Sequence, residues 1–226
     1  MTGERRRVLL AEGIGTCFLL VGVVGSGIMA ERLSPDDVGL QLLENAAATA
    51  AVLVAIISIF GTISADFNPA VSLAAWLLGH RSGREVPGMV AMQVLGGCAG
   101  TVLANLMFDL SWVDTSMQVR SGGDLWLAEV VATVGLLLVV FSLVRTARMS
   151  AMPYVVGVYI GGAYFFTSST SFANPAVTVA RTLSDTFAGI EPSSAPMFVL
   201  MQVVGVGVAV ALARMLFPRE AVPVGA

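Results

Sequence analysis

The sequence has no lysine, one histidine, two cysteines and little charge of either sign. Charged residues make up 12% of the 226 residues, whereas soluble domains carry about 25%. Hydrophobic residues make up 56%, so the chain has too little polar surface to cover a globule in water. This composition excludes an ordinary soluble domain and predicts an integral membrane protein. Cys17 and Cys98 both lie in apolar stretches, which predicts small buried side chains rather than a disulfide framework. Nothing in the sequence indicates an enzyme, a cofactor, a metal site or nucleic-acid binding.

Six apolar segments are long enough to cross a bilayer, which takes about 20 residues. They are residues 8–29, 40–62, 88–108, 125–145, 153–170 and 197–217. Two shorter apolar runs, about 69–78 and 175–183, reach only about half of a ~30 Å hydrocarbon core. The sequence therefore predicts an all-α membrane protein with six transmembrane helices and two re-entrant half-helices. The first segment follows three arginines, as a signal peptide would, but lacks a convincing cleavage site and is predicted to be a retained helix.

Each short run begins with the same tripeptide, Asn-Pro-Ala. The residues are Asn68, Pro69 and Ala70 in the first run and Asn174, Pro175 and Ala176 in the second. Asn is a good N-cap and Pro suits the first helical position, so each tripeptide predicts the start of a helix. One such tripeptide is a weak signal. Two of them, at matching places in two similar halves of an apolar chain, are a strong one.

The two halves of the chain also match elsewhere. Ala11-Glu12 in the first half corresponds to Ala128-Glu129 in the second, and Gln93 corresponds to Gln202. With three spans per half, the second copy is inverted in the membrane, and inverted repeats place a shared site near the bilayer midplane. We therefore expect one domain over residues 1–226 with repeats at about 8–108 and 125–217, and the two Asn side chains at its centre.

The arginines predict the orientation in the membrane. Under the six-helix topology only Arg32, Arg120 and Arg181 fall on one side. The other side carries Arg5, Arg6, Arg7, Arg81, Arg84, Arg145, Arg148, Arg214 and Arg219. The positive-inside rule places that side, with both termini, in the cytoplasm. The exclusive use of arginine also points weakly to a GC-rich bacterial genome, so the predicted location is a bacterial inner membrane.

The paired Asn-Pro-Ala tripeptides, the Ala-Glu pairs and the two glutamines resemble the aquaporin, or major intrinsic protein, family over about residues 8–217. The resemblance implies six tilted helices with two half-helices, and assembly as a homotetramer in the lipid bilayer. In such an arrangement the N-termini of the half-helices and the amides of Asn68 and Asn174 offer donors to water or a neutral solute and repel cations.

The carboxylates Glu12 and Glu129 lie inside predicted spans, where a charge is costly unless it is satisfied. Two interpretations are open. Each carboxylate either accepts hydrogen bonds from a re-entrant loop, which the family resemblance favours, or forms part of a proton relay in a coupled transporter. Gln93 and Gln202 are similarly expected to pack or to hold a loop rather than to contact the pore.

The position after the second tripeptide departs from the family pattern. Most members carry Arg there, and that Arg helps to form the outer constriction, whereas this chain has Val177. Counting back from Asn174 gives Gly162 and Ser171 as further filter positions, and the second-helix position falls at Ala48 or Thr49. All of these residues are small, so we expect a wide and less polar filter. Tyr164, Phe165 and Phe166 are expected to pack behind the outer loop.

Two charged residues near the predicted pore each leave an alternative open. Arg181 lies one turn beyond Val177, where it either supplies charge to an outer vestibule or pairs with Asp185 four residues on. Asp66 either lies at the cytoplasmic mouth or caps its loop.

The sequence as a whole predicts a passive channel for small uncharged solutes. The Val in place of Arg resembles a bacterial subgroup linked to arsenic resistance, which implies permeation by arsenite, As(OH)3, and related metalloids, with glycerol and water as further permeants. A strict water channel is the first alternative. A proton-coupled transporter that uses Glu12 and Glu129 is the second.

Overall fold

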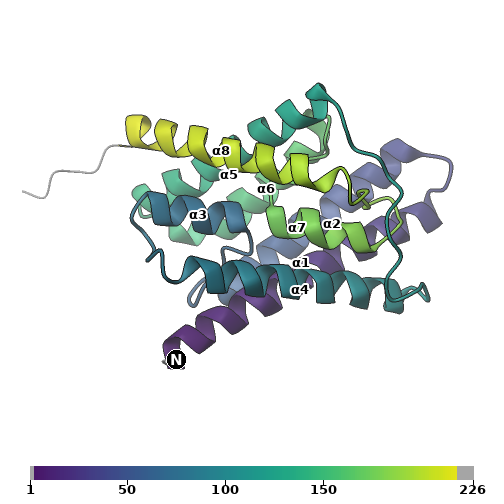
Figure 1. Cartoon of the computed structure of the whole chain (residues 1–226), viewed down its shortest axis with the longest axis horizontal. Coiled ribbons are helices and arrows are strands. Elements are labelled where there is room, and N and C mark those ends of the chain that lie inside the picture. Colours follow the sequence, from purple (N-terminus) through teal and green to yellow (C-terminus); the bar gives the residue numbers. More distant parts are fainter. Residues whose placement is uncertain (1–2, 218–226) are drawn as a thin grey trace, which may run out of the picture.

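The computed structural model describes residues 3–217, and every regular element in that range is a helix (Figure 1). Six helices are long and apolar enough to cross a membrane, which confirms the predicted number of spans. Their bounds are α1 Gly3–Leu33, α2 Val38–Phe60, α4 Val86–Met107, α5 Gly123–Arg145, α6 Met152–Phe166 and α8 Ala195–Leu216. Arg219, which contributed to the predicted orientation, lies outside the described residues.

The two half-helices begin where the tripeptides predict. Helix α3 spans Pro69–Leu77 and α7 spans Pro175–Ala180, each with its Asn as N-cap and its Pro in the first turn. The second run stays α-helical only to Ala180 and then tightens into a short 3₁₀ turn, η2, over Arg181–Leu183. The predicted fifth span is also too long, because α6 ends at Phe166 and Thr167 is already extended.

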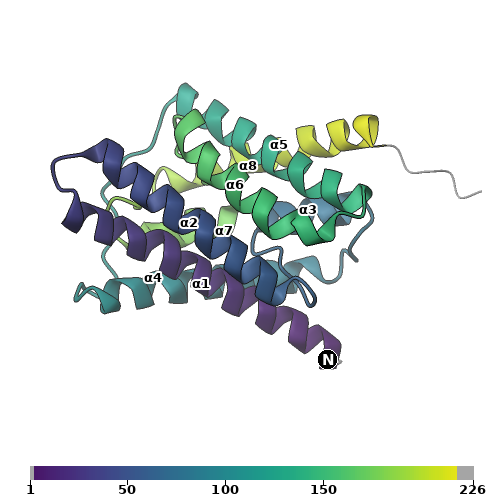
Figure 2. The same cartoon turned by 180° about the vertical axis from the view of Figure 1, so that it is seen from behind.

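The helices pack as two copies of one arrangement. Helix α1 contacts α2 and α4, and α5 contacts α6 and α8 in the same way. The half-helices cross between the copies, since α3 contacts α8 and α7 contacts α4, and α3 and α7 meet at the centre (Figures 1 and 2). The beginning of α1 and the end of α8 lie at one end of the molecule, which we call the inner end, while α5 begins at the opposite, outer end. The second copy is therefore inverted relative to the first.

Small residues allow the spanning helices to approach closely. A Cβ atom on Gly96 of α4 would lie 2.1 Å from the carbonyl oxygen of Gly13 in α1. On Gly157 of α6 it would lie 2.8 Å from the carbonyl oxygen of Ala50 in α2. Such distances are shorter than any ordinary contact, so only glycine fits at these positions. The α2–α6 contact joins the two copies and fixes the relative register of these helices.

Large apolar side chains cover the outside of the helix bundle. Phe18, Leu95, Val158 and Met215 are 57%, 64%, 73% and 77% exposed. Exposed apolar surface on this scale is unusual in a soluble monomer but suits contact with lipid or with other membrane helices. Together with the six long apolar helices, it describes a multi-pass membrane protein.

Candidate channel and its lining

A cavity of about 660 Å³ runs along the molecule between the two copies. At the inner end its lining includes Asp66, His80 and Met149. The central part is lined by Asn68 and Asn174. The outer part is lined by Thr49, Tyr164, Ser171, Phe172, Val177 and Arg181. The cavity therefore passes both tripeptides, as a channel through the centre would.

The two asparagines bind each other's loops across the centre. Asn68 Nδ2 donates to the carbonyl of Ala173 at 2.8 Å, and Asn174 Nδ2 donates to the carbonyl of Phe67 at 2.8 Å. Each Oδ1 accepts from the backbone of its own half-helix, at Ala70 or Ala176. A side-chain amide has two N–H groups. Each asparagine thus caps its helix, joins the two copies and keeps one N–H for the cavity that it lines.

The acceptor residues in this exchange adopt an uncommon backbone conformation. Phe67 has φ 48° and Ala173 has φ 47°, the left-handed region that non-glycine residues rarely occupy. Each left-handed residue costs of order 1–3 kcal/mol and persists only where its surroundings hold it. At both positions the carbonyl accepts a hydrogen bond from the Asn of the other copy.

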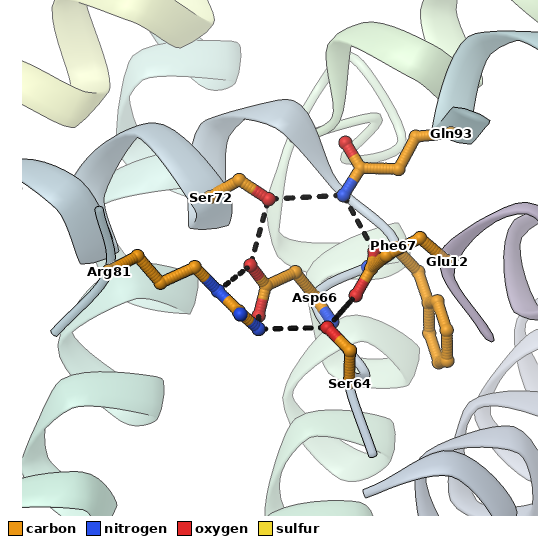
Figure 3. Close-up of polar contacts among 7 residues, drawn as sticks. All are labelled: Glu12, Ser64, Asp66, Phe67, Ser72, Arg81 and Gln93. Carbon is orange, nitrogen blue, oxygen red and sulfur yellow. Dashed lines mark hydrogen bonds and ion pairs between the residues drawn. The ribbon is translucent and has the colours of Figure 1, made fainter. Parts of the chain in front are cut away.

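Glu12 of α1 holds the first re-entrant loop (Figure 3). Its Oε1 accepts from the Ser64 hydroxyl and, at 3.0 Å, from the backbone N–H of Asp66. Its Oε2 accepts from the N–H of Phe67 at 2.8 Å and from Gln93 Nε2 at 2.7 Å. The carboxylate therefore binds the N–H of the left-handed residue itself.

Glu129 of α5 repeats these contacts in the second copy. Its Oε1 accepts from the Ser169 hydroxyl at 2.7 Å and the N–H of Phe172 at 2.9 Å. Its Oε2 accepts from the N–H of Ala173 at 2.9 Å and from Gln202 Nε2 at 2.6 Å. Both glutamates are fully buried, and neither belongs to the cavity lining. Their contacts are those of loop anchors.

The first copy has an ion pair at the inner mouth of the cavity. Asp66 forms an ion pair with Arg81 at 2.9 Å and accepts from the Ser72 hydroxyl at 2.8 Å. Arg81 also donates to the Ser64 hydroxyl, which binds Glu12 (Figure 3). Burial lowers the pKa of Arg81, but the Asp66 carboxylate outweighs this effect and leaves the pKa above its ordinary value. Asp66 thus lies at the mouth and also holds its loop, so the two interpretations of this residue are compatible.

Some of the expected filter residues line the cavity and others do not. Thr49 lines the cavity, whereas Ala48 lines a separate groove between α1, α2 and α4. Of the two candidates for the second-helix position, Thr49 rather than Ala48 therefore faces the cavity. Gly162 is a second correction, because it is exposed and a Cβ atom there would meet only Phe166 of its own helix. The residues of α6 that line the cavity are instead Met152 and Pro153 in its first turn and then Val156, Ile160 and Tyr164, at four-residue spacing.

Tyr164 was expected to pack behind the loop, but it lines the cavity and is 3% exposed. Its hydroxyl lies 3.2 Å from Thr49 Oγ1. Counting back from Asn174 selected Gly162, two residues before Tyr164. The four-residue spacing of apolar and aromatic side chains in α6 was the signal that could have identified Tyr164. The side chains that line the outer part of the cavity are therefore not all small, and they are not less polar than expected for a filter. Both findings differ from the expectation from sequence.

Val177 and Ser171 both line the cavity. Val177 is 5% exposed, and its backbone N–H donates to Asn174 Oδ1 at 3.2 Å. Within residues 3–217 the hydroxyl oxygen of Ser171 is buried and has no hydrogen-bond partner.

Arg181 lines the outer part of the cavity and does not pair with Asp185. Its Nε donates to the carbonyl of Ala188, and its guanidinium lies 3.5 Å from the ring centre of Phe172. Asp185 instead accepts from the N–H of Met117 at 2.8 Å. The four-residue pairing is lost because η2 ends at residue 183 and the chain is extended at residue 184.

A second arginine lies against the same ring. Arg120 is 5.3 Å from the ring centre of Phe172 and donates to the carbonyls of Gly189 and Phe187. Burial lowers the pKa of Arg120. Neither Arg120 nor Arg181 forms an ion pair with a carboxylate in the described chain. The outer end therefore carries positive charge that carbonyl oxygens and an aromatic face stabilise.

The exchange of hydrogen bonds between the two copies predicts a measurable loss of stability on substitution. Asn174→Ala removes both the helix cap and the bond to Phe67, which together contribute about 2 kcal/mol. Asn174→Ser keeps a capping oxygen but is too short to reach Phe67, so we expect about half of that loss. Thermal unfolding in detergent, followed by circular dichroism, measures both. A Ser variant as stable as the unmodified protein would show that the bond between the copies contributes nothing.

Within residues 3–217 no group of three or more His, Cys, Asp or Glu side chains is placed to hold a metal ion. The geometry is that of a lined passage between two inverted copies. The Major intrinsic protein family model matches residues 2–173, about three quarters of the chain, and the chain belongs to that family of membrane channels.

Individual relatives agree with this assignment. The chain is 49% identical over 211 residues to aquaglyceroporin AqpS of Rhizobium meliloti (strain 1021), covering 93% of this chain and 90% of that protein. It is 30% identical over 149 residues to aquaporin NIP2-1 of Arabidopsis thaliana, covering 62% and 51%. The fold resembles the X-ray structure of the aquaglyceroporin from Plasmodium falciparum, with a TM-score of 0.73 at 19% identity over 92% of this chain and 95% of that one.

Proposed function

We propose that the protein is a passive channel of the aquaglyceroporin type that conducts small uncharged solutes, including glycerol, with water as a further permeant. The observation that carries the proposal is the continuous cavity past two interlocked asparagines, each with a spare amide N–H. A hydroxyl or water oxygen accepts a hydrogen bond from such a donor, whereas a cation meets positive partial charge. Two relatives support the solute class, because their names describe an aquaglyceroporin and a probable glycerol uptake facilitator.

We further propose arsenite, as As(OH)3, among the permeants. This neutral molecule offers three hydroxyl groups of the kind that the asparagine amides can bind. Val177 supports it, since a branched apolar side chain at this point leaves room that an arginine would fill. The same opening would admit related neutral metalloids.

The geometry favours a channel over a proton-coupled transporter. A proton relay needs carboxylates that reach the transport path, but Glu12 and Glu129 are fully buried, lie outside the cavity lining and accept four hydrogen bonds each. Asp66 is the only carboxylate that lines the cavity within residues 3–217, and it is paired with Arg81. In the described part of the chain, no carboxylate lines the cavity between the inner mouth and the outer end.

Uptake by proteoliposomes distinguishes the two mechanisms. Vesicles with the purified protein are given arsenite at neutral pH, with and without an imposed proton gradient, and the arsenic inside is measured by mass spectrometry. We expect uptake that is faster than in empty vesicles and equal in both conditions. Accumulation above the outside concentration, or uptake only with the gradient, would contradict a passive channel.

The positive charge at the outer end predicts an effect on ion exclusion. At an effective dielectric constant of about 20, a unit charge contributes on the order of 2 kcal/mol to the energy of a cation about 8 Å away. We therefore expect Arg181→Met to raise cation leak by about tenfold or more, since about 1.4 kcal/mol corresponds to tenfold. Neutral solute flux is expected to change little.

Potassium flux into proteoliposomes, followed with an ion-sensitive dye, measures this leak. Arg214→Met is the matched control, because Arg214 is exposed on α8 and donates to the carbonyl of Leu77 outside the cavity lining. An equal leak in both variants would assign the effect to general damage rather than to the charge of Arg181.

The location and assembly follow the same reasoning. We propose that the protein lies in a bacterial inner membrane with both termini in the cytoplasm, because most arginines of the described chain lie at the inner end. We also propose a homotetramer, because the apolar outer faces of the helices can pack against other copies.

A further inference from the structure

On α2 and α6, the outermost side chains that line the cavity come from different copies. From α2 the lining residues run from Ser58 near the inner end to Thr49, with none nearer the outer end. From α6 they run from Met152 to Tyr164, which lies in the last turn before the helix ends at Phe166. Thr49 and Tyr164 therefore lie at the same level, where α2 and α6 stop lining the cavity.

These two side chains are hydrogen-bonded to each other. The two hydroxyl oxygens are 3.2 Å apart, and the residues are 2% and 3% exposed. The helices that carry them cannot easily slide, because Gly157 lies against the backbone of Ala50 and Gly161 against its side chain. The register of α2 against α6 thus fixes the distance between the two hydroxyl groups. It holds the phenol ring of Tyr164 at the outer limit of the cavity.

The surroundings of the ring make it a boundary on one side of the passage. Phe172, Val177 and Arg181 line the same outer part from the other re-entrant loop. Arg181 and Phe172 are fixed by their own contacts, the first to the carbonyl of Ala188 and the second between two arginines. Tyr164 is the large side chain there that is buried in the core and whose hydroxyl bonds to Thr49 of the other copy. The side chain of Val177 is too small to set the width alone.

We propose that Tyr164, held by Thr49, is the specificity-determining residue that sets the upper size limit for solutes at the outer end. Its ring takes the place of the bulky filter group that is absent at Val177. Release of the ring from Thr49 lets it turn aside, so larger hydroxyl-bearing solutes pass more easily. This inference rests on the proposed channel function and adds to it the residue that limits solute size.

The test compares glycerol and water permeability in proteoliposomes by stopped-flow light scattering, per amount of reconstituted protein. Tyr164→Ala removes the ring and is expected to raise glycerol permeability severalfold, and the ratio of glycerol to water with it. Tyr164→Phe keeps the ring but removes the bond, and Thr49→Val removes the bond from the other side. Each is expected to give a smaller rise of similar size. The double variant Tyr164→Phe with Thr49→Val is expected to add nothing further, because both changes remove one interaction.

Two variants serve as matched controls. Tyr159→Phe changes a tyrosine on the same helix whose hydroxyl donates to the carbonyl of Ala132 and which is outside the cavity lining. Thr101→Val changes a buried threonine of α4 that is also outside the lining. Both are expected to leave the ratio of glycerol to water unchanged.

Each result bears on the proposal. The proposal is overturned if Tyr164→Ala does not raise glycerol permeability, or if Tyr159→Phe raises it equally. It is also overturned if neither Tyr164→Phe nor Thr49→Val raises glycerol permeability, or if their two effects add in the double variant. Tyr164→Phe retains the shape of the side chain and keeps the test valid if the Ala variant does not fold. If the unmodified protein passes water but no solute, the proposed function fails, yet glycerol flux that appears in Tyr164→Ala would still support this role of Tyr164.

Discussion

Val177→Arg is expected to reduce glycerol permeability by about tenfold or more, which corresponds to about 1.4 kcal/mol or more in the barrier. The long guanidinium would enter the outer part of the cavity, which Val177 now lines with a short side chain. Water is small enough to pass beside it, so its permeability is expected to fall less. Stopped-flow light scattering on proteoliposomes measures both.

The same substitution would place two arginines on successive turns. Residues 177 and 181 are four apart, and the backbone at Arg181 is still helical. Like charges at this spacing repel. Arg181 already occupies the outer part of the cavity, so the native Val avoids a second buried cation there.

Two further variants separate size from charge. Val177→Leu adds volume without charge and is expected to lower glycerol flux only modestly. Val177→Arg combined with Arg181→Val moves the cation by one turn and is expected to be more stable than Val177→Arg alone. Equal reduction of glycerol and water in Val177→Arg would contradict the interpretation of Val177 as a filter position.

Glu129→Gln is expected to cause a large loss of stability for so conservative a substitution. All four donors around Glu129 point at carboxylate oxygens, two at each oxygen. Gln replaces one oxygen by an NH2 group, which then faces two donors. A buried donor left without an acceptor costs about 1–3 kcal/mol, so two of them cost about 2–6 kcal/mol. The left-handed Ala173 also loses part of what holds it if that oxygen is replaced.

Thermal unfolding in detergent, followed by size-exclusion chromatography, measures the loss. Glu85→Gln is the control, because Glu85 is exposed and makes no capping bond to α4. A Glu129→Gln protein that unfolds at the native temperature would show that the anchor is dispensable. A stable Glu12→Gln protein that loses only gradient-driven uptake would favour the transporter mechanism instead.

The sequence predicted the features that repeat in both halves. The six spans, the two capped half-helices and the inverted arrangement follow from apolar length, Asn-Pro and an odd number of spans per copy. A loop-holding role for Glu12 and Glu129 was one of the two interpretations that the sequence left open, since a carboxylate in lipid needs donors and a re-entrant loop has spare N–H groups. Local chemistry determines each of these features.

The filter could not be predicted to the same degree, because it depends on how each helix is rotated about its axis. Counting along the chain selected Gly162 and allowed Ala48, yet the rotation of α6 and α2 presents Tyr164 and Thr49 to the cavity. The contacts of Arg181 depend on a backbone carbonyl at residue 188, in a loop that carries no sequence signal. The repeat also does not predict where the two copies differ, as Asp66 in one and Phe172 in the other, both two residues before the asparagine.

The central claim is a passive pore wide enough for small uncharged solutes. The most direct test is stopped-flow light scattering of proteoliposomes that contain the unmodified protein, with water and glycerol compared at neutral pH and without any ion gradient. The structure predicts that both permeate far faster than in protein-free vesicles. Fast water flux with glycerol flux at the level of empty vesicles would contradict it and would mean that the outer end is closed to everything larger than water.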